Sequence, residues 1–501
     1  MGLRTTSIVD VIRRNATVCP DRTAFVFGER RISHAEYARR VEWLAAALAA
    51  RGITAGDRVV VLSENNPEFV DLLGAAAWLG AILVPINWRL SADEIAYIIG
   101  DAAPKLVVAD ASHRETFLTA RPEFAKIAHW IGIGFAAPPF VSLDDCLSAA
   151  AAAPPPWGGE GAAVMVHTAA VSGRPRGALV TQAGLLMNAM HAIHVWSVGV
   201  DDVSYAPLPL FHIAGLNLLM TCLCAGATSL VTPRFDAQEA ARLIADEKAT
   251  LFVEFAPMLG AVLDAAGGGR SLASLRVAGG LDTPETIARF EAACPDARFF
   301  VGFGQTETSG FVTMAPFRER PGSAGRPLLL TSVAVVDESD QPVPTGAVGE
   351  IVVRGPGVFE GYWNCPDDTA ATFRNGWHHT GDNGAFDADG YLWYKGRSAA
   401  KELIKPGGEN VYPAEVEAAL KAHDAVSEAV VFGIPDKEWG EAIKAVCILR
   451  AGAAASADEI SAFVASRIAR YKRPKHLVLA EQLPRLDDGR IDRVKIKALF
   501  S

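Results

Sequence analysis

The chain has 501 residues, half of them hydrophobic, and a formal net charge of −10 at neutral pH. This length exceeds one ordinary domain and corresponds to roughly three structural units. Because acidic and basic residues are interspersed, the composition argues against nucleic acid as the main partner. Seven cysteines are scattered without the spacing of metal ligands, which favours a reduced, cytoplasmic protein with buried thiols.

The N-terminal segment, MGLRTTSIVDVIRRN, lacks a continuous apolar core of signal-peptide length. The longest apolar run, from Ile213 to Val231, has the length of a membrane span. Because Gly226 divides this run and no cationic flanks accompany it, we expect a buried helix followed by a strand rather than a transmembrane segment. A peripheral contact with a membrane surface and a homodimer both stay open.

Strand and helix patterns alternate through two blocks of the chain. In the first block, strands are expected at 58–62, 81–86 and 106–109, and helices at 67–79 and from Ala92 onwards. The last of these helices follows a capping box formed by Ser91 and Glu94. In the second block, strands are expected at 227–231, 250–254, 275–278 and 298–302, with helices between them. This alternation predicts two parallel-type sheets with helices on both faces.

The pattern changes after about Gly325, where short strands separated by turn residues predict a small β-barrel or distorted sheet. These strands are expected at Val333 to Asp337, Glu350 to Arg354 and Tyr391 to Lys395. Mixed patterning then resumes, with helices at 414–421 and 457–471 and strands at 428–433 and 444–449. We therefore predict an α/β protein with an N-terminal domain over 1–396, a hinge over 397–402, and a small, mobile α+β domain over 403–501.

Four short motifs stand in a fixed order in the second half of the chain. They are FVGFGQTETSG at 300–310, HHTGDNG at 378–384, KGR at 395–397 and PGGENVYP at 406–413. Each combines glycines with hydroxyl, carboxylate or guanidinium groups, which suit a nucleotide, its magnesium ion and its ribose. Together they resemble the adenylate-forming superfamily of acyl-CoA synthetases, adenylation domains and firefly-type luciferases, over nearly the whole chain.

A candidate phosphate loop lies at 164–177, VMVHTAAVSGRPRG, where a strand leads into glycine, proline and hydroxyl residues. Backbone N–H groups of such a loop suit phosphate oxygens, although an ordinary loop is the alternative. The superfamily usually ends this run in Pro-Lys-Gly, and here Arg176 replaces the lysine. The resemblance implies that Thr168, Ser172, Gly173 and Arg176 bind ATP, and that Thr168 also takes part in catalysis.

Two strand ends supply further candidates, because open α/β sheets bind ligands beyond the carboxyl ends of their strands. At the first, the resemblance implies that Gly279, Gly280 and Leu281 flank adenine and that Gly280 also borders the acyl carboxylate. At the second, it implies nucleotide contacts from Gly302, Phe303, Gly304, Gln305 and Thr306. Phe303 offers an aromatic face to adenine, and Glu307 offers the oxygen ligand that magnesium prefers. Glu307 is therefore the predicted catalytic metal ligand.

Three further motifs complete the predicted site. Asp382 is placed to accept both ribose hydroxyls, since a carboxylate has two acceptor oxygens, and Arg397 adds a ribose or phosphate contact. His212, in LPLFHIAG, resembles the aromatic and histidine gate of the acyl site, although most single histidines are packing residues. The loop with Gly407, Gly408 and Glu409 resembles the one that supports thioester formation, where glycines let a pantetheine arm approach.

The segment at 483–497, LPRLDDGRIDRVKIK, departs from the superfamily pattern. The superfamily usually has Gly-Lys here, with a lysine that bridges the acyl carboxylate and the α-phosphate. This chain has Arg490, which keeps the charge but presents a planar fork. The resemblance implies that Arg490 is the catalytic cation, with Lys495 or Lys497 as alternatives.

The sequence therefore predicts a cytoplasmic acyl-CoA synthetase that uses ATP, Mg²⁺ and coenzyme A. Its two steps would give acyl-AMP with pyrophosphate, and then acyl-CoA with AMP. Mostly apolar pocket candidates favour a medium-chain or long-chain fatty acid, or an alicyclic or aromatic acid, over malonate: Met187, Met190, Phe211, Leu216 and Phe255. Two alternatives stay open, namely an adenylation enzyme that loads a carrier protein and a nucleotide-binding relative with impaired catalysis.

Overall fold

The computed structural model describes residues 6–118, 121–148, 153–156, 161–168, 174–267, 271–397, 403–407, 409–436, 439–486 and 490–500. By their internal contacts the residues form two compact units. The first contains Met1–Trp88, Ile98–Thr168 and Arg176–Gly396, and the second contains Arg397–Ser501 with Arg89–Tyr97 and the described part of 169–175. The main change of unit falls between Gly396 and Arg397, and the hinge at 397–402 stays a prediction.

A seven-stranded sheet holds the first predicted α/β block, in the order β7-β6-β5-β3-β4-β8-β9. Its strands are β3 (Arg58–Leu62), β4 (Ile82–Pro85), β5 (Leu106–Asp110), β6 (His129–Ile133), β7 (Val141–Ser142), β8 (Ala162–Thr168) and β9 (Arg176–Thr181). All neighbours are parallel except β8 and β9, which are antiparallel. The apolar runs of β3 and β5 follow from burial on both faces of the sheet.

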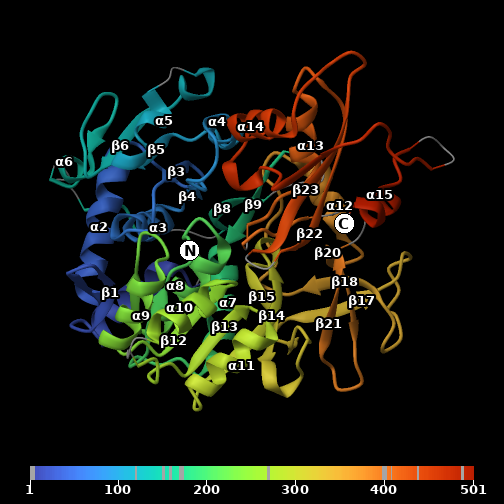
Figure 1. Ribbon diagram of the computed structural model, residues 1–501. Helices are drawn as coiled ribbons and strands as arrows, with labels where there is room; N and C mark the ends of the chain where they lie inside the picture. Colours follow the sequence, from blue (N-terminus) through green and yellow to red (C-terminus); the bar gives the residue numbers. More distant parts are fainter. Residues whose placement is uncertain are drawn as a thin grey trace. The chain divides into compact units, whose positions relative to one another are not determined.

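Helices pack around this sheet, and Figure 1 shows α2 and α3 beside it. The helices of this unit in the first block are α2 (His34–Ala50), α3 (Pro67–Leu79), α5 (Glu115–Leu118) and α6 (Leu143–Ser148), whereas α4 (Ala92–Ala102) is divided between the two units. Helix α3 has the predicted bounds; Asn66 is its N-cap, Pro67 lies in its first turn, and it ends at Gly80 in the left-handed region. Helix α4 begins at Ala92, as predicted.

A nine-stranded sheet holds the second block, in the order β16-β15-β14-β13-β12-β10-β11-β1-β2. Its later strands are β10 (Val203–Ala206), β11 (Thr228–Val231), β12 (Leu251–Phe255), β13 (Val277–Leu281), β14 (Arg298–Gln305), β15 (Gly310–Pro316) and β16 (Arg326–Pro327). Helices α7 (Gln182–Trp196) and α8 (Ile213–Ala225) share one hydrophobic cluster with the sheet. Helices α9 (Ala237–Asp246), α10 (Met258–Ala266) and α11 (Pro284–Ala293) share another.

The first strands of the chain, β1 (Thr23–Phe27) and β2 (Arg30–Ser33), complete the edge of this second sheet. Strand β1 pairs in parallel with β11, about two hundred residues later, and follows helix α1 (Ile8–Val18). The predicted blocks were contiguous in sequence and did not contain this crossing. The apolar run from Ile213 to Val231 is α8 followed by β11, as predicted, and no helix among the described residues is long and apolar enough to cross a membrane.

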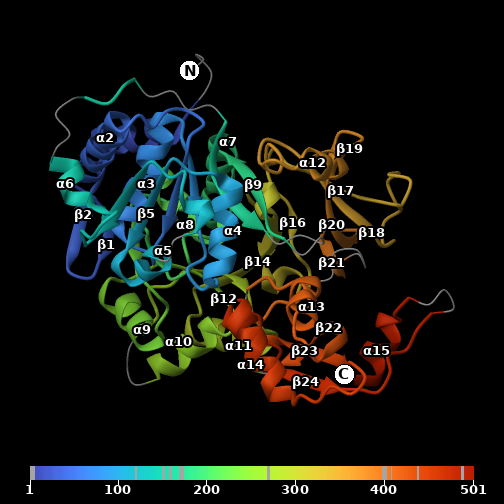
Figure 2. The same ribbon diagram turned by 90° about the horizontal axis from the view of Figure 1, so that it is seen from above.

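The region after Gly325 forms a five-stranded sheet, which Figure 2 shows with α12 (Pro366–Thr372) beside it. Its strands are β17 (Ser332–Val336), β18 (Gly349–Arg354), β19 (Phe373–Arg374), β20 (Trp377–Phe386) and β21 (Leu392–Arg397). The β17–β18, β18–β20 and β19–β20 pairs are antiparallel. The distorted sheet, rather than a closed barrel, is therefore the alternative that describes this region.

The second unit contains a three-stranded sheet, β22 (Val426–Asp436), β23 (Gly440–Leu449) and β24 (His476–Leu479). Strands β22 and β23 are antiparallel, and β23 and β24 are parallel. Figure 2 shows α13 (Pro413–Lys421), α14 (Ala457–Arg467) and α15 (Arg493–Phe500) around the sheet. Helix α14 begins with a capping box of Ser456 and Glu459, and its residues Ile460 and Val464 are buried. The predicted α+β fold of this region is confirmed.

Candidate active site

Two strand ends from different sheets meet at the carboxylate of Glu307. Glu307 lies in a short 3₁₀ helix, Thr306–Thr308, directly after β14, and Thr168 is the last residue of β8. Glu307 Oε1 accepts a hydrogen bond of 3.0 Å from Thr168 Oγ1 and one of 2.9 Å from the hydroxyl of Tyr362. Two residues predicted from distant motifs are therefore neighbours, and a third joins them.

Tyr362 is a residue of this site that the sequence reasoning missed. The loop that carries it is fixed by hydrogen bonds on both sides: Phe359 N to Glu307 O (2.9 Å), Ser309 Oγ to Gly357 O (2.6 Å), Leu179 N to Gly361 O (3.0 Å) and Trp363 N to Gly177 O (2.7 Å). The available signal was an aromatic run, FEGYW, at 359–363, between two expected strands. Such a run has many packing explanations, so it did not point to Glu307.

Arg176 supplies positive charge next to this carboxylate. Its guanidinium carbon lies 3.9 Å from the ring centroid of Tyr362, and it forms an ion pair of 3.0 Å with Asp368. The Arg176 Nε atom is buried and has no hydrogen-bond partner in the described part of the chain. The predicted phosphate contacts Ser172 and Gly173 lie outside the described residues. Thr168, Arg176 and Glu307 thus lie together around Tyr362, and their roles toward ATP stay predictions.

Asp382 is nearly buried on β20, with 2 % of its surface exposed. Its Oδ1 accepts a hydrogen bond of 3.1 Å from the Tyr394 hydroxyl, and its Oδ2 accepts one from Gln305 Nε2. Gln305 Nε2 also lies 3.0 Å from the carbonyl of Thr380. The carboxylate is therefore held in place by the chain before any ribose binds, and its role toward the ribose stays a prediction.

The ring of Phe303 packs into the core of the five-stranded sheet and is 8 % exposed. Tyr394 stacks on it, with ring centroids 6.1 Å apart and an interplanar angle of 30°. An adenine that stacks on Phe303, as predicted, therefore meets a ring whose surface is mostly covered. That contact stays a prediction, and the neighbouring Tyr394 is a second aromatic ring at the same place.

Glycines at the strand ends allow close backbone packing. A side chain at Gly302 or Gly304 would meet the carbonyl of Thr313 or of Gly310 at 2.5 and 2.1 Å. Gly280 has a φ of +140°, and a Cβ there would lie 1.8 Å from the carbonyl of Glu254. These three predicted contacts thus have a packing reason that is independent of any ligand. The two remaining residues of AGGL, Gly279 and Leu281, lie on β13, with Leu281 48 % exposed.

The predicted acyl residue His212 lies directly before α8 in an aromatic group. Its ring centroid is 4.6 Å from that of Phe211, which in turn lies 6.4 Å from that of Trp88. Among the other predicted pocket residues, Leu216 is buried, whereas Met190 is 54 % exposed. The sequence analysis did not select the polar side chains of α7 and α8 as residues of the acyl site.

Asn217 on α8 and His191 on α7 are buried polar side chains, each with one hydrogen bond to a carbonyl. Asn217 Nδ2 donates to Ser309 O at 2.8 Å, and His191 Nε2 lies 2.6 Å from Leu329 O. The opposite atoms, Asn217 Oδ1 and His191 Nδ1, have no hydrogen-bond partner among the residues that the structure describes. Burial lowers the pKa of His191, against the opposing effect of the Leu329 and Phe311 carbonyls.

The chemistry of these two free atoms follows from their partners. A carbonyl only accepts hydrogen bonds, so His191 Nε2 carries the proton and Nδ1 of the neutral ring keeps a lone pair. The same argument orients the amide of Asn217, with Oδ1 turned away from Ser309. Both atoms are therefore hydrogen-bond acceptors. In the sequence, Asn217 could have been selected because it is a single Asn in the apolar run that begins at Ile213.

The second unit contains the remaining predicted residues. Arg397 donates a long hydrogen bond of 3.5 Å to the hydroxyl of Tyr412, and Glu409 is buried in an ion pair with Arg89. A Cβ on Gly407, whose φ is +57°, would lie 2.6 Å from the ring of Trp439. Gly408 lies outside the described residues. Arg490 is exposed and Lys495 lies on α15, so their roles stay predictions.

The residues around Glu307 fit a magnesium ion that arrives with a nucleotide. No group of three or more metal-binding side chains is present in the described part of the chain. Mg²⁺ in nucleotide sites keeps waters and is bound by one or two carboxylates together with phosphate oxygens. One carboxylate next to the Thr168 hydroxyl and the Arg176 cation satisfies that requirement, whereas a site made of protein ligands alone is not present among the described residues.

Two sequence families match the chain. The family described as AMP-binding enzyme covers residues 12–363, and the AMP-binding enzyme C-terminal domain covers residues 415–490. Among curated proteins, the chain is 35 % identical to an indoleacetate–CoA ligase of Aromatoleum aromaticum, over 98 % of this chain and 97 % of the relative. It is 34 % identical to a feruloyl-CoA synthase of an Amycolatopsis species, over 97 % of this chain and 98 % of the relative.

The chain is also similar to solved structures. One is a candidate long-chain-fatty-acid CoA ligase from Rhodopseudomonas palustris, which is 50 % identical with a TM-score of 0.76 and covers 79 % of this chain and 100 % of its own. The named acids of these relatives are therefore of different kinds.

Proposed function

Because the chain belongs to the AMP-binding enzyme family and is an AMP-forming acid–thiol ligase, we propose that its acid is an aromatic carboxylic acid with a ring N–H or O–H donor. The observation that carries this proposal is a pair of buried acceptors, Asn217 Oδ1 and His191 Nδ1, on helices α8 and α7, which have no partner among the described residues. His212, which resembles the gate of the acyl site, lies directly before α8.

The energetics favour a ligand that completes these hydrogen bonds. A buried acceptor without a partner costs about 1 to 3 kcal/mol. A fatty acyl chain would leave both acceptors unpaired, whereas an indole N–H or a phenolic O–H would pair with one of them. The names of two relatives, an indoleacetate–CoA ligase and a feruloyl-CoA synthase, agree with this chemistry.

The first step is attack of the acid carboxylate on the α-phosphate of ATP, which forms acyl-AMP and releases pyrophosphate. This step requires positioning and charge neutralisation more than covalent help from the protein. We assign the phosphate contacts to Thr168 and Arg176 and the ribose contacts to Asp382. Glu307 would hold Mg²⁺, which neutralises phosphate charge when it is bound. The hydrogen bonds from Thr168 and Tyr362 keep the Glu307 carboxylate in one orientation.

The second step is displacement of AMP by the thiol of coenzyme A. A free carboxylate would have to expel oxide, so adenylation supplies the leaving group that thioester formation needs. We assign the loop with Gly407 and Glu409 to this step and Arg490 to the first step. Both assignments rest on the motifs.

A pair of acids that differ in one donor tests the proposed substrate class. The full chain is assayed for CoA-dependent AMP release with indole-3-acetate and with benzothiophene-3-acetate, which has a similar shape but no N–H. We expect at least a tenfold higher kcat/KM for the indole, which corresponds to about 1.4 kcal/mol. Equal kcat/KM values, or a preference for dodecanoate over both, would contradict the proposal.

A further inference from the structure

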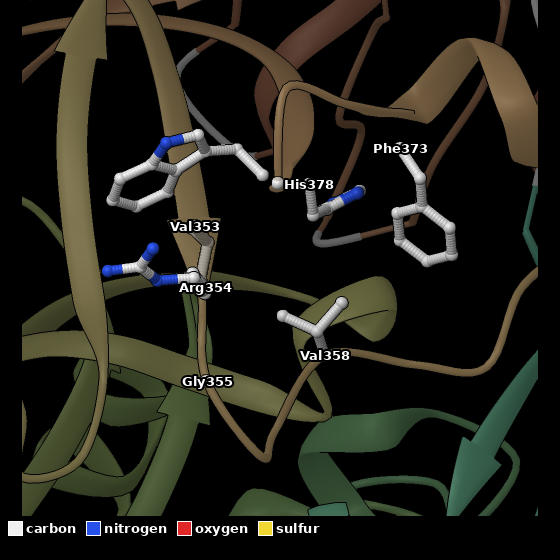
Figure 3. Close-up of a pocket in the computed structure, with 8 residues that line it drawn as sticks. Val353, Arg354, Gly355, Val358, Phe373 and His378 are labelled. Carbon is white, nitrogen blue, oxygen red and sulfur yellow. The ribbon is translucent and has the colours of Figure 1, made fainter.

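A hollow in the five-stranded sheet involves none of the residues assigned above to ATP, acid or CoA. It has a volume of about 360 Å³. Figure 3 shows Val353 and Arg354 on one side, Phe373 on the other, and Val358 and His378 between them. The hollow lies beside the β19–β20 hairpin, whose strands are joined by only two residues.

The walls of this hollow combine two aromatic side chains with one cation. The Arg354 guanidinium carbon lies 4.8 Å from the ring centroid of Trp377, and Arg354 is exposed. Arg354 forms no side-chain hydrogen bond or ion pair with any described residue. Phe373 is held edge-on against Phe359, with ring centroids 5.2 Å apart at 62°, so its position is fixed by packing.

The groups that line the hollow restrict the ligand. Its side chains are aliphatic, aromatic, one histidine and one arginine, so the lining residues that the structure describes present no carboxylate and no hydroxyl. The histidine is engaged by its neighbours: His378 Nδ1 lies 3.1 Å from Thr372 Oγ1, and Nε2 lies 3.4 Å from Gln305 Oε1. The cation available to a ligand in this lining is therefore Arg354.

We propose that this hollow is an accessory binding site for a flat aromatic monocarboxylate. Its volume is at the lower end of the roughly 300 to 1,000 Å³ of small-molecule pockets, which suits a ligand of one or two rings. A guanidinium binds a carboxylate through two parallel hydrogen bonds, and an aromatic ring packs favourably on Trp377 and Phe373. A nucleotide fits less well, because its ribose hydroxyls would find no carboxylate and its phosphates only one cation.

This inference rests on the lining of the hollow and is independent of which acid the enzyme activates. The probe is 5-bromoindole-3-acetate, a flat aromatic monocarboxylate whose bromine is an anomalous scatterer. In crystals of the full chain soaked with the probe, we expect a bromine peak between Trp377 and Phe373. In solution, calorimetry with the wild-type chain should detect one equivalent of the probe that corresponds to this hollow.

Variants connect the solution measurement to this place. Arg354→Gln should weaken this equivalent at least tenfold, and Trp377→Leu provides a second variant of the same wall. The matched control is Arg318→Gln, at another exposed arginine, which should bind the probe as the wild type does. Because Arg354 has no assigned role in catalysis, the kcat and KM of CoA-ligase turnover should be unchanged in Arg354→Gln.

Several outcomes would overturn the proposal. The first is a bromine peak that appears only at another place, and the second is binding of the probe at soaking concentration but not in solution. The third is a bound equivalent of probe that Arg354→Gln leaves unchanged, and the fourth is AMP rather than the probe in this hollow. Turnover with indole-3-acetate is measured separately. A chain that does not activate the acid but still loses one bound equivalent in Arg354→Gln would contradict the proposed function and support the accessory site.

Discussion

The polar atoms of Glu307 and Asp382 are paired by hydrogen bonds within the protein, whereas Asn217 Oδ1 and His191 Nδ1 have no such partner among the described residues. Glu307 and Asp382 each accept two hydrogen bonds from side chains of the protein. Asn217 Oδ1 and His191 Nδ1 accept none from any described residue. Adenylation is the same reaction for every acid, so its groups can be oriented in advance by the protein. Under the proposed function, Asn217 Oδ1 and His191 Nδ1 would become paired only when the acid binds.

The largest expected effect is that of a change at Glu307, whose carboxylate the protein orients in advance. Glu307→Gln keeps the shape but removes the charge that would hold Mg²⁺, so acid-dependent pyrophosphate release should fall at least 100-fold, or about 2.7 kcal/mol. Circular dichroism should show an intact fold. Glu338→Gln, at an exposed glutamate, is the matched control and should keep wild-type activity. Near-normal release by Glu307→Gln at saturating magnesium would remove Glu307 from this role.

A smaller loss is expected at the ribose. Hydrogen bonds to a charged group contribute about 1.5 to 3 kcal/mol each, so Asp382→Ala should weaken AMP binding at least tenfold. Calorimetry with AMP measures this directly. Asp296→Ala changes an exposed aspartate and should bind AMP as the wild type does. If Asp382→Ala also binds AMP normally, then Asp382 only positions Gln305 and Tyr394.

A third experiment changes Asn217, whose Oδ1 atom accepts no hydrogen bond from any described residue. Asn217→Leu removes one unpaired acceptor, so the preference for indole-3-acetate over benzothiophene-3-acetate should fall about tenfold, by roughly 1.4 kcal/mol. Because Asn217→Leu also removes the hydrogen bond to Ser309 O, the kcat/KM can change for both acids, and the diagnostic result is the larger loss with indole-3-acetate than with the sulfur analogue. A preference that does not change would show that Asn217 does not face the acid.

The smallest effect on turnover is expected at a buried acid that belongs to neither site. Glu254 is fully buried on β12, and Oε1 has no hydrogen-bond partner among the described residues. Burial, and then the nearby Asp282, raise the pKa of Glu254 well above its usual range. The folded state therefore holds a proton that the unfolded state releases, and stability decreases as pH rises above the ordinary pKa of a glutamate.

Glu254→Gln should remove this dependence. Denaturant unfolding of the wild type from pH 5 to 8 should show a stability that decreases with pH, by at most about 1.4 kcal/mol per unit for one proton. The Gln variant should show a flatter profile and higher stability at pH 8. Glu285→Gln, at an exposed glutamate, should follow the wild type. A steeper decrease in Glu254→Gln would mean that the carboxylate is charged and stabilising in the folded protein.

Local patterns in the sequence predicted most of the regular structure. The strand at Arg58–Leu62 and the helix at Pro67–Leu79 have the predicted bounds, because apolar periodicity and caps are local properties. The pairing of β1 with β11 was not predictable, because nothing in a strand of five residues specifies a partner two hundred residues away. Strand β9 was also missed, because it begins at Arg176, which the sequence analysis assigned to the candidate phosphate loop.

The same distinction holds at the site. Thr168, Arg176 and Glu307 were selected because each belongs to a motif of several residues, and their roles stay predictions. Tyr362, His191 and Asn217 were not selected, since each is a single polar residue in a packed segment and its role depends on which atoms remain unpaired. That property exists only in three dimensions.

The place of β1 at the edge of the second sheet has a consequence during synthesis. Strand β1 ends at Phe27, and its partner β11 begins at Thr228, so the ribosome adds roughly 200 residues before the pair can form. At about 5 to 20 residues per second, this interval lasts roughly 10 to 40 s. During that time β1 has only β2 as a possible partner in the sheet, so its apolar residues stay exposed and a nascent chain stalled before β11 should bind chaperones.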